Sequence, residues 1–199
     1  MKIIVLCGIK HSGKSTLGKH LSKKLNAFFF DIDTIIEKNE KTNVRELYLS
    51  QGKNAFIEAE KKATETILSE LEKSNKNQIA IISTGGGICD NENAIELLKN
   101  QNALFIFLDI PQEIAFERIQ FKAKQTGSMP AYISNKNPKN EDEERDIFYS
   151  YFKERTEKYK AFCEHKISLD VSNNYTKSRK KNTEKILRLI AESDYLEYP

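Results

Sequence analysis

The stretch GIKHSGKS at residues 8–15 decides the fold class of this chain. It fits the pattern G-x-x-x-x-G-K-[ST], and it lies between an apolar run at residues 3–7 and an amphipathic stretch. Gly8 and Gly13 allow a tight turn whose backbone N–H groups face inward, and the following helix directs the positive end of its dipole at the same place. The sequence therefore predicts a strand–loop–helix unit that binds the phosphates of a nucleotide.

The residues of this loop have separate expected roles. Lys14 should reach the β- and γ-phosphates of ATP, and the Ser15 hydroxyl should be a ligand of Mg²⁺. A histidine at position 11 can contact phosphate, but positions between the two glycines also vary freely, so both interpretations stay open. The expected ATP contacts in this part of the chain are Gly8, His11, Ser12, Gly13, Lys14, Ser15 and Thr16.

Short apolar runs alternate with longer amphipathic stretches along the rest of the chain. This alternation predicts an α/β protein in three layers, a phosphate-loop fold with a five-stranded parallel sheet covered by helices on both faces. A length of 199 residues favours a single domain, residues 1–199. The expected strands are 2–7, 27–30, 78–83, 103–108 and 166–170, and the expected helices are 14–25, 33–38, 43–50, 53–74, 91–99, 111–126, 144–163 and 176–192.

One segment interrupts the helical pattern. Between about residues 125 and 143 the sequence is rich in Gly, Pro, Asn and Ser, and it is too long for a simple connection in a compact domain. We expect a mobile lid over about 120–146. An ordinary surface insertion is the alternative interpretation.

Composition and charge argue against several functional classes. The 32 basic and 29 acidic side chains are interspersed and leave a net charge of +3, so no basic face predicts nucleic-acid binding. The apolar run at 3–7 is too short for a membrane span or a signal-peptide core. Cys7, Cys89 and Cys163 lack the spacing of a zinc site and are expected to be reduced thiols. We expect a cytoplasmic monomer without nucleic-acid or membrane partners.

Two carboxylates follow the second expected strand. Asp31 and Asp33 emerge at its carboxyl end, which is the edge where ligands bind in open α/β sheets. Residues two apart share one face of an extended chain, so one carboxylate can hold Mg²⁺ while the other accepts the proton of an attacking hydroxyl. The alternative is that Asp33 only caps the next helix.

Three consecutive glycines follow the third expected strand. Gly85, Gly86 and Gly87 remove every side chain there, which lets a substrate lie against the backbone, although a flexible turn explains them equally well. No aspartate ends this strand in the position that other phosphate-loop enzymes use for the metal. Asp31 is therefore the candidate metal carboxylate.

Taken together, the order of these elements resembles the shikimate kinase family. The shared features are the N-terminal phosphate loop, D-x-D, F-x-x-x-E at residues 56–60, G-G-G, a lid and a late arginine. The resemblance implies a nucleoside-monophosphate-kinase-like fold, ATP with Mg²⁺, and phosphorylation of the 3-hydroxyl of shikimate in aromatic amino-acid synthesis. The protein's partners would then be ATP and a small hydroxy acid.

The resemblance also implies roles for single residues. Asp33 matches the aspartate at the substrate hydroxyl, Asp31 matches the one near magnesium, and Gly85, Gly86 and Gly87 match the substrate-side glycines. Arg155 resembles the arginine that holds the substrate carboxylate, with a helix-surface ion pair to Glu154 or Glu157 as the alternative. Arg118 resembles the arginine that lies against adenine.

This chain departs from the family pattern at two positions. Ile57 stands where the family has a carboxylate-binding arginine, which would leave Glu60 without its partner, and Met129 replaces the lid arginine. Charge-assisted hydrogen bonds are worth about 1.5–3 kcal/mol each, so these losses matter. The lysines considered as replacements are Lys61, Lys62, Lys122 and Lys124.

These departures keep other functions open. One alternative is a kinase for a different small acceptor, such as the gluconate used by the similar gluconate kinases. A nucleoside monophosphate would need several arginines around its phosphates, and the chain has six in all. A second alternative, from another class, is a non-catalytic nucleotide-binding module.

Overall fold

The computed structural model describes residues 1–74, 78–172, 174–193 and 195, so the expected single domain extends at its end beyond the described residues. In chain order its elements are β1 (Lys2–Cys7), α1 (Lys14–Leu25), β2 (Phe28–Asp31), α2 (Ile32–Glu40), α3 (Val44–Glu72), β3 (Ile79–Ser83), the 3-10 helix η1 (Ile88–Asp90), α4 (Glu92–Lys99), β4 (Leu104–Asp109), α5 (Gln112–Thr126), α6 (Ala131–Ser134), α7 (Glu141–Phe162), β5 (His165–Ser168) and α8 (Tyr175–Glu192).

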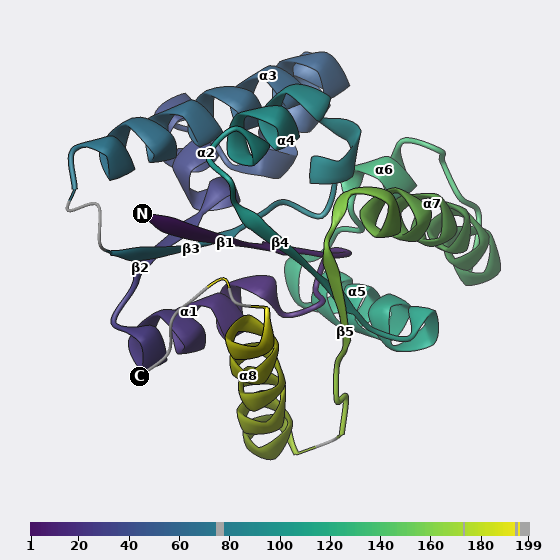
Figure 1. Ribbon diagram of the computed structural model, residues 1–199. Coiled ribbons are helices and arrows are strands. Elements are labelled where there is room, and N and C mark those ends of the chain that lie inside the picture. The colour runs from purple at the N-terminus through teal and green to yellow at the C-terminus, as the bar shows by residue number, and fades with distance from the viewer. Residues whose placement is uncertain (75–77, 173, 194, 196–199) are drawn as a thin grey trace.

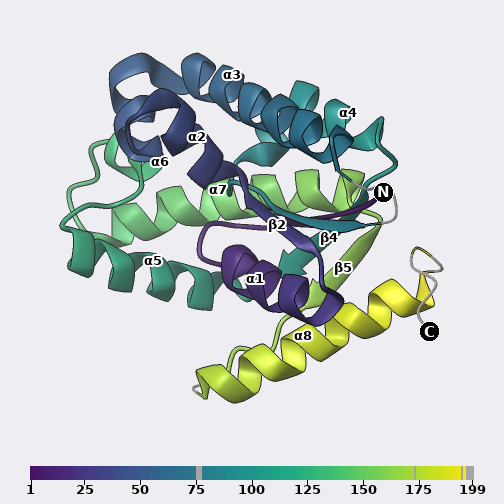
Figure 2. The same ribbon diagram turned by 90° about the vertical axis from the view of Figure 1, so that its left-hand side faces the viewer.

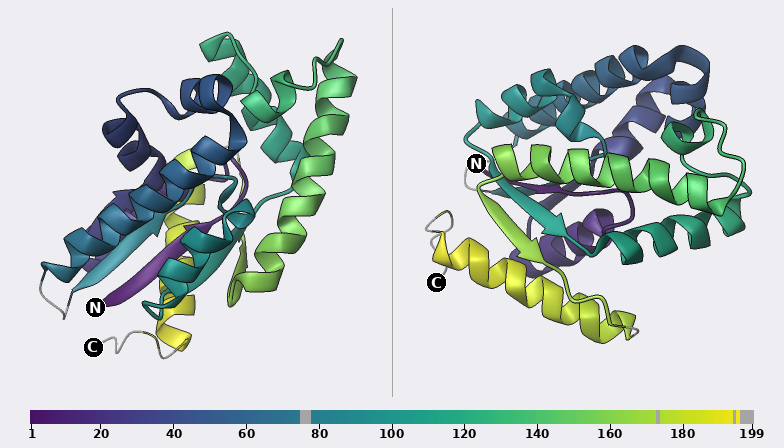
Figure 3. Two further views of the ribbon diagram at one scale, coloured as in Figure 1. Left: turned by 90° about the horizontal axis from the view of Figure 1, so that it is seen from above. Right: turned by 90° about the vertical axis from the view of Figure 1, so that its right-hand side faces the viewer.

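Five parallel strands form one sheet in the order β2-β3-β1-β4-β5. Helices α3 and α4 cover one face of the sheet, and α1 and α8 cover the other (Figure 1). Helix α7 lies on the same side as α3 and α4 (Figure 3), while α5 and α6 gather at the edge toward which the strands point (Figure 2). The predicted three-layer α/β architecture with a five-stranded parallel sheet is confirmed.

The central strands are apolar throughout because helices bury both of their faces. Residues 3–7 of β1, 80–83 of β3 and 104–108 of β4 are all buried. Edge strand β2 is only partly buried. Since all strands run in one direction, the loops after β1, β2, β3 and β4 meet at a single edge of the sheet, where the predicted site residues were expected.

Most element boundaries shift by up to two residues from the predicted ones, and the start of α7 shifts by three. Helix α7 begins at Glu141 rather than 144, because Asn140 caps it by accepting a hydrogen bond from the Glu143 N–H and the first turn is acidic. The segment expected to lack regular structure contains the short helix α6. Helix α2 begins at Ile32, so Asp33 lies in a helix and not on an extended chain.

Helix α3 contains a break that separates the two helices expected at 43–50 and 53–74. Gly52 has φ 82° and ψ −179°, a conformation that is essentially restricted to glycine. Nothing lies within 4 Å of the place where a Cβ of Gly52 would be, so the backbone alone requires glycine there.

Among the described residues, no helix combines the length and the apolar character that crossing a membrane requires.

We predict that G52N lowers the free energy of unfolding by about 1–3 kcal/mol, because asparagine cannot relax into this backbone conformation. The matched control is G127N. Gly127, with φ 72° and ψ 11°, has the left-handed helical conformation that asparagine tolerates, and space around it is open. That change should cost less than about 0.5 kcal/mol. Urea denaturation of both variants makes the comparison, and equal costs would contradict it.

Candidate active site

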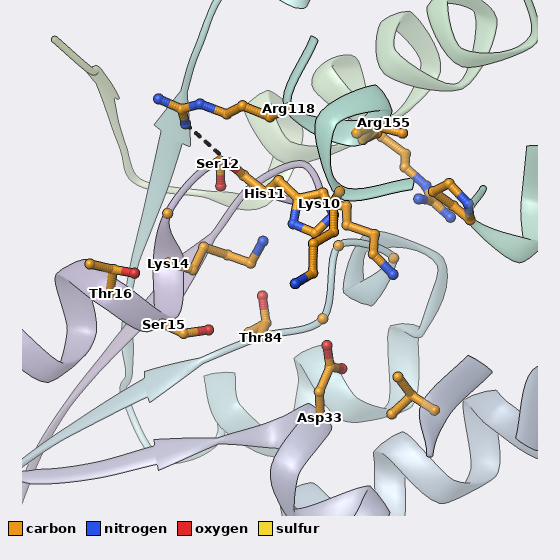
Figure 4. A pocket seen from close by; sticks show the side chains of 18 of the residues that line it. Lys10, His11, Ser12, Lys14, Ser15, Thr16, Asp33, Thr84, Arg118 and Arg155 are labelled. Atoms are coloured by element: carbon orange, nitrogen blue, oxygen red, sulfur yellow. Dashed lines mark hydrogen bonds between the residues drawn. The ribbon is translucent and has the colours of Figure 1, made fainter. Parts of the chain in front are cut away.

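A cavity of about 1370 Å³ opens at the edge where the strands end. Its walls come from the phosphate loop, from α2 and α3, from the turn after β3, from α5 to α7, and from the chain after β5. Figure 4 shows the phosphate loop with Lys14 on one side, Asp33 below and Arg155 on the far side. The cavity therefore brings together residues from Lys10 to Asn182, which lie about 170 positions apart in the chain.

The phosphate loop has the structure that its motif predicts. It joins buried β1 to α1, and Gly13 takes the left-handed conformation directly before the helix. Gly8 has φ 149°, and a Cβ there would be 2.7 Å from the Leu108 carbonyl oxygen, so a side chain does not fit. Tyr159, buried on α7, donates a hydrogen bond of 3.2 Å to the Gly8 carbonyl. The loop is thus held from both β4 and α7.

Lys14 is buried in the wall of the cavity. Its Nζ donates to the carbonyl oxygens of Gly8 at 2.8 Å and Ile9 at 3.0 Å. Burial lowers the pKa of Lys14 to about 8, and the charge of Asp33 opposes this shift. A polyanion in the loop would raise this pKa and favour the charged form further. Ser12 Oγ is also buried and has no hydrogen-bond partner among the described residues.

His11 turns the loop toward α5. It has φ 63°, the left-handed conformation, and its carbonyl accepts a hydrogen bond of 3.1 Å from Arg118 (Figure 4). Burial and the nearby charges of Lys10 and Lys14 lower the pKa of His11 to about 4. Its imidazole is therefore neutral near pH 7 and is not a cation for phosphate. Arg118 lines the cavity as expected, positioned by the loop backbone.

The two aspartates after β2 have different environments. Asp31 caps α2 by accepting a hydrogen bond of 3.4 Å from the Thr34 N–H, and it is absent from the cavity wall. The expectation that both carboxylates share one face of an extended chain is wrong, and so is the alternative that Asp33 is the cap. Asp33 lines the cavity, and burial, followed by the charge of Asp31, raises its pKa. In the sheet, Asp31 of β2 is the register neighbour of Ser83 on β3. The Ser83 Oγ is 3.4 Å from the Ser15 Oγ.

The three glycines after β3 face three different side chains or loops. A Cβ on Gly85 would be 2.9 Å from a Glu60 oxygen and 3.0 Å from an Asp33 oxygen. A Cβ on Gly86 would be 2.7 Å from the backbone N of Lys10, and one on Gly87 would be 3.1 Å from Arg155 Nη2. The simple flexible-turn interpretation is therefore incomplete, since close packing requires that no side chain be present.

Glu60 is fully buried and lacks an arginine partner. Asn91 Nδ2 donates to its Oε2 at 3.0 Å, while Oε1 has no partner among the described residues. Burial raises the pKa of Glu60 to about 8. Ile57, at the position of the family arginine, also lines the cavity. Glu60 is thus a neutral acid near pH 7, with its free oxygen beside Gly85.

Arg155 lines the cavity and does not lie on the exposed surface of its helix. Its Nη2 is 3.3 Å from Asp90 Oδ2, and its guanidinium lies 5.2 Å and 5.4 Å from the ring centroids of Tyr132 and Tyr151. The alternative, a helix-surface ion pair with Glu154 or Glu157, is wrong, because Glu154 pairs with Lys158 at 2.7 Å and Glu157 with Lys160 at 2.8 Å. The side chain of Arg155 is only 14% exposed.

The segment after α5 closes over the cavity in this structure. Residues 128–132, including Met129, line the cavity, and α6 packs against α3. Arg45 on α3 donates hydrogen bonds to the Met129 carbonyl and, at 3.4 Å, to Ser134 Oγ. The segment therefore forms a cover latched to α3, and its mobility stays a prediction.

Of the lysines considered as replacements for the missing arginines, Lys61 pairs with Glu65 at 3.7 Å, outside the cavity. Lys62 and Lys124 do not line the cavity, and Lys122 does so beside His11, at the nucleotide end. The cations that sequence reasoning missed in the part of the cavity near Asp33 and Arg155 are Lys10, Arg45 and Lys53. Only the first had a signal, its place inside the phosphate-loop motif.

Comparisons with known proteins agree with this geometry. A family model described as "Shikimate kinase" matches residues 10–191. A shikimate kinase from a Sulfurihydrogenibium species is 36% identical over 120 residues, which are 60% of this chain and 68% of that protein. The solved shikimate kinase of Aquifex aeolicus superposes with a TM-score of 0.68 at 28% identity and covers 100% of both chains.

A second solved structure, described as shikimate kinase from Acinetobacter baumannii in complex with shikimate, has a TM-score of 0.76. It covers 97% of this chain and 94% of its own, and at 22% identity it supports the fold.

We predict that E60Q removes part of the pH dependence of stability. Because the folded pKa of Glu60, about 8, exceeds its ordinary value of 4.5, its contribution to stability is complete below pH 4.5 and is lost as pH rises to 8. The amide is neutral at every pH. E60Q should therefore match the wild type near pH 4.5 and be more stable by about 2–4 kcal/mol above pH 8.

Denaturant unfolding of both proteins at several pH values measures this difference. A difference that does not change with pH would contradict the raised pKa of Glu60.

Proposed function

Because the chain belongs to the shikimate kinase family, we propose that it transfers the γ-phosphoryl group of ATP to the 3-hydroxyl of shikimate. The observation that carries this proposal is one cavity in which the phosphate loop faces Asp33 and Arg155 across the turn of Gly85–Gly87. In that arrangement the phosphate loop can bind a polyphosphate, the carboxylate of Asp33 can accept a hydrogen bond from a hydroxyl, and the guanidinium of Arg155 can bind an acidic group. These three features support an acceptor that carries both a hydroxyl and an acidic group.

At the nucleotide end, the loop amides, Lys14 and the N-terminus of α1 bind the phosphates. Lys14 exchanges its two carbonyl partners for phosphate oxygens, and Arg118, held by the His11 carbonyl, lies against the base. Buried Ser12 Oγ is free to donate to a phosphate oxygen. Each of these groups stabilises negative charge without rearrangement of the loop.

Mg²⁺ fits the hydroxyl of Ser15 and, through water, the carboxylate of Asp31. The support is chemical: the Ser15 and Ser83 hydroxyls are 3.4 Å apart, and Ser83 pairs with Asp31 on the neighbouring strand. Oxygen donors of this kind suit Mg²⁺, which keeps several waters and takes phosphate oxygens as further ligands. When bound, the ion neutralises charge on the phosphates.

At the acceptor end, Asp33 orients the attacking hydroxyl and accepts its proton. A bond forms from the hydroxyl oxygen to the γ-phosphorus while the bond to the β–γ bridging oxygen breaks, and ADP leaves. Burial raises the pKa of Asp33, which makes its carboxylate a better proton acceptor. Arg155, held by Asp90 and two tyrosines, binds the acceptor carboxylate.

The segment expected as a lid, about residues 120–146, includes this cover. When closed, it excludes water, which would otherwise accept the phosphoryl group. We propose that it opens at the Arg45 contact to admit substrates. We also propose a cytoplasmic monomer: the cysteines are free thiols, and the exposed large apolar side chains are scattered over β2, α3, α5 and α8.

We predict that shikimate stimulates ADP release from Mg-ATP in a coupled assay with purified protein. Gluconate at the same millimolar concentration serves as the comparison acceptor. If gluconate but not shikimate stimulates turnover, the protein has a different acceptor. If the protein binds nucleotide but phosphorylates neither acceptor, it is a non-catalytic module. Both results would contradict the proposal.

We further expect D33N to lower kcat for shikimate by about 10²–10⁴-fold, because an amide cannot accept the proton. The KM for ATP should stay within about twofold of the wild type. The matched control is D142N, whose carboxylate is 84% exposed on α7. The acid limb of the wild-type kcat/KM profile should lie above pH 3.8, since the pKa of Asp33 is raised. Unchanged turnover in D33N would disprove its role.

A further inference from the structure

Lys10 is a half-buried cation at the acceptor end of the cavity. Its backbone packs against Gly86, where a Cβ would be 2.7 Å from its N atom. Figure 4 places it between Lys14 and Arg155, above Asp33. It thus lies over the middle glycine of the turn, whose first glycine meets Asp33 and whose last meets Arg155.

The neighbouring cations already have partners. Arg155 pairs with Asp90, Arg45 donates to the Met129 carbonyl, and Lys14 donates to two carbonyls of its own loop. Within the described ranges, Lys10 has neither an ion pair nor a hydrogen bond from its Nζ. Lys53 also lines the cavity without such a partner among the described residues, but it is exposed to solvent, so Lys10 is the partly buried cation available to a bound anion at this end.

The surroundings of Lys10 disfavour its charge in the free protein. Burial lowers the pKa of Lys10, the charges of Arg45 and Arg155 lower it further, and Asp33 alone among the main neighbours raises it. An anion placed beside Lys10 and Arg155 would relieve this repulsion. The cost of holding three cations together is thus recovered when an acid binds.

We propose that Lys10 is a specificity-determining residue that, with Arg155, binds the carboxylate of the acceptor. This inference rests on the proposed function and adds to it the residue that supplies the second positive charge, since Ile57 and Met129 supply none. A lysine contributes a mobile point charge where an arginine would give a planar fork, so it selects for negative charge more than for carboxylate geometry.

An alternative role for Lys10 is binding the γ-phosphate, because it belongs to the phosphate loop. The packing favours the acceptor: Lys10 faces Gly86, Asp33 and the two arginines, whereas Lys14 and Arg118 serve the nucleotide end. The two roles differ in which substrate loses affinity when the charge is removed.

The test is a comparison of K10M with the wild type on two acceptors. One is shikimate, and the other is its methyl ester, which keeps the hydroxyls and lacks the charge. K10M should raise the KM for shikimate about 10- to 100-fold, the effect of losing one charge-assisted contact, with kcat and the KM for ATP within about twofold. For the ester, K10M and the wild type should have equal kcat/KM.

Three further variants make the result specific. K10R should recover most of the affinity for shikimate, and K10Q is a second neutral variant should K10M fold poorly. K61M, which removes a lysine outside the cavity, is the matched control and should equal the wild type. Without substrates, K10M should melt at the same temperature as the wild type or higher, because the charge it removes is disfavoured by its surroundings.

The outcomes separate this inference from the proposed function. A wild-type protein that does not phosphorylate shikimate overturns the proposed function and this inference with it. A wild type that is active, with an unchanged KM for shikimate in K10M, overturns only the role of Lys10. An increase in the KM for ATP instead assigns Lys10 to the phosphates, and an equal loss with the ester shows that it does not recognise the carboxylate.

Discussion

The close backbone packing of the phosphate loop is the contact on which the rest of the site depends. Gly8 lies against the Leu108 carbonyl on β4, and Gly86, after β3, lies against the backbone of Lys10. At both contacts the glycine has no room for a Cβ. These contacts fix the loop between its two neighbouring strands. The parallel sheet then carries Asp33 and the turn of Gly85–Gly87 to the same edge, so the nucleotide and acceptor ends share one frame.

Burial disfavours the charged forms of several ionisable side chains in the cavity while no anion is bound. Burial lowers the pKa of Lys14 to about 8 and raises that of Glu60 to about 8, so near pH 7 Lys14 keeps most of its positive charge while Glu60 is mostly neutral. Such shifts are typical of sites that bind charged substrates, where the protein is arranged for the complex and not for the free state. The stability of the free protein is correspondingly reduced, which is the usual relation between active sites and folding.

Much of the fold could be predicted because its signals are local. The five strands start and end within two residues of their predicted positions, since continuous apolar runs mark strands buried on both faces. The start of α7 was missed although Asn140 and the acidic turn after it are a recognisable cap. The surroundings of Arg155 and Lys10 could not be predicted, because they depend on Asp90 and Gly86, which approach only once the sheet has formed.

The contact between Arg45 and the cover has a consequence for which substitutions the cover of this chain tolerates. Arg45 binds the carbonyl of Met129, a main-chain group that every amino acid carries. Substitutions at position 129 can therefore change what the cover offers to the acceptor without releasing the cover itself. Closure of the cover and the side-chain chemistry that it presents to the cavity are therefore separable, so a methionine at position 129 leaves the contact with Arg45 intact.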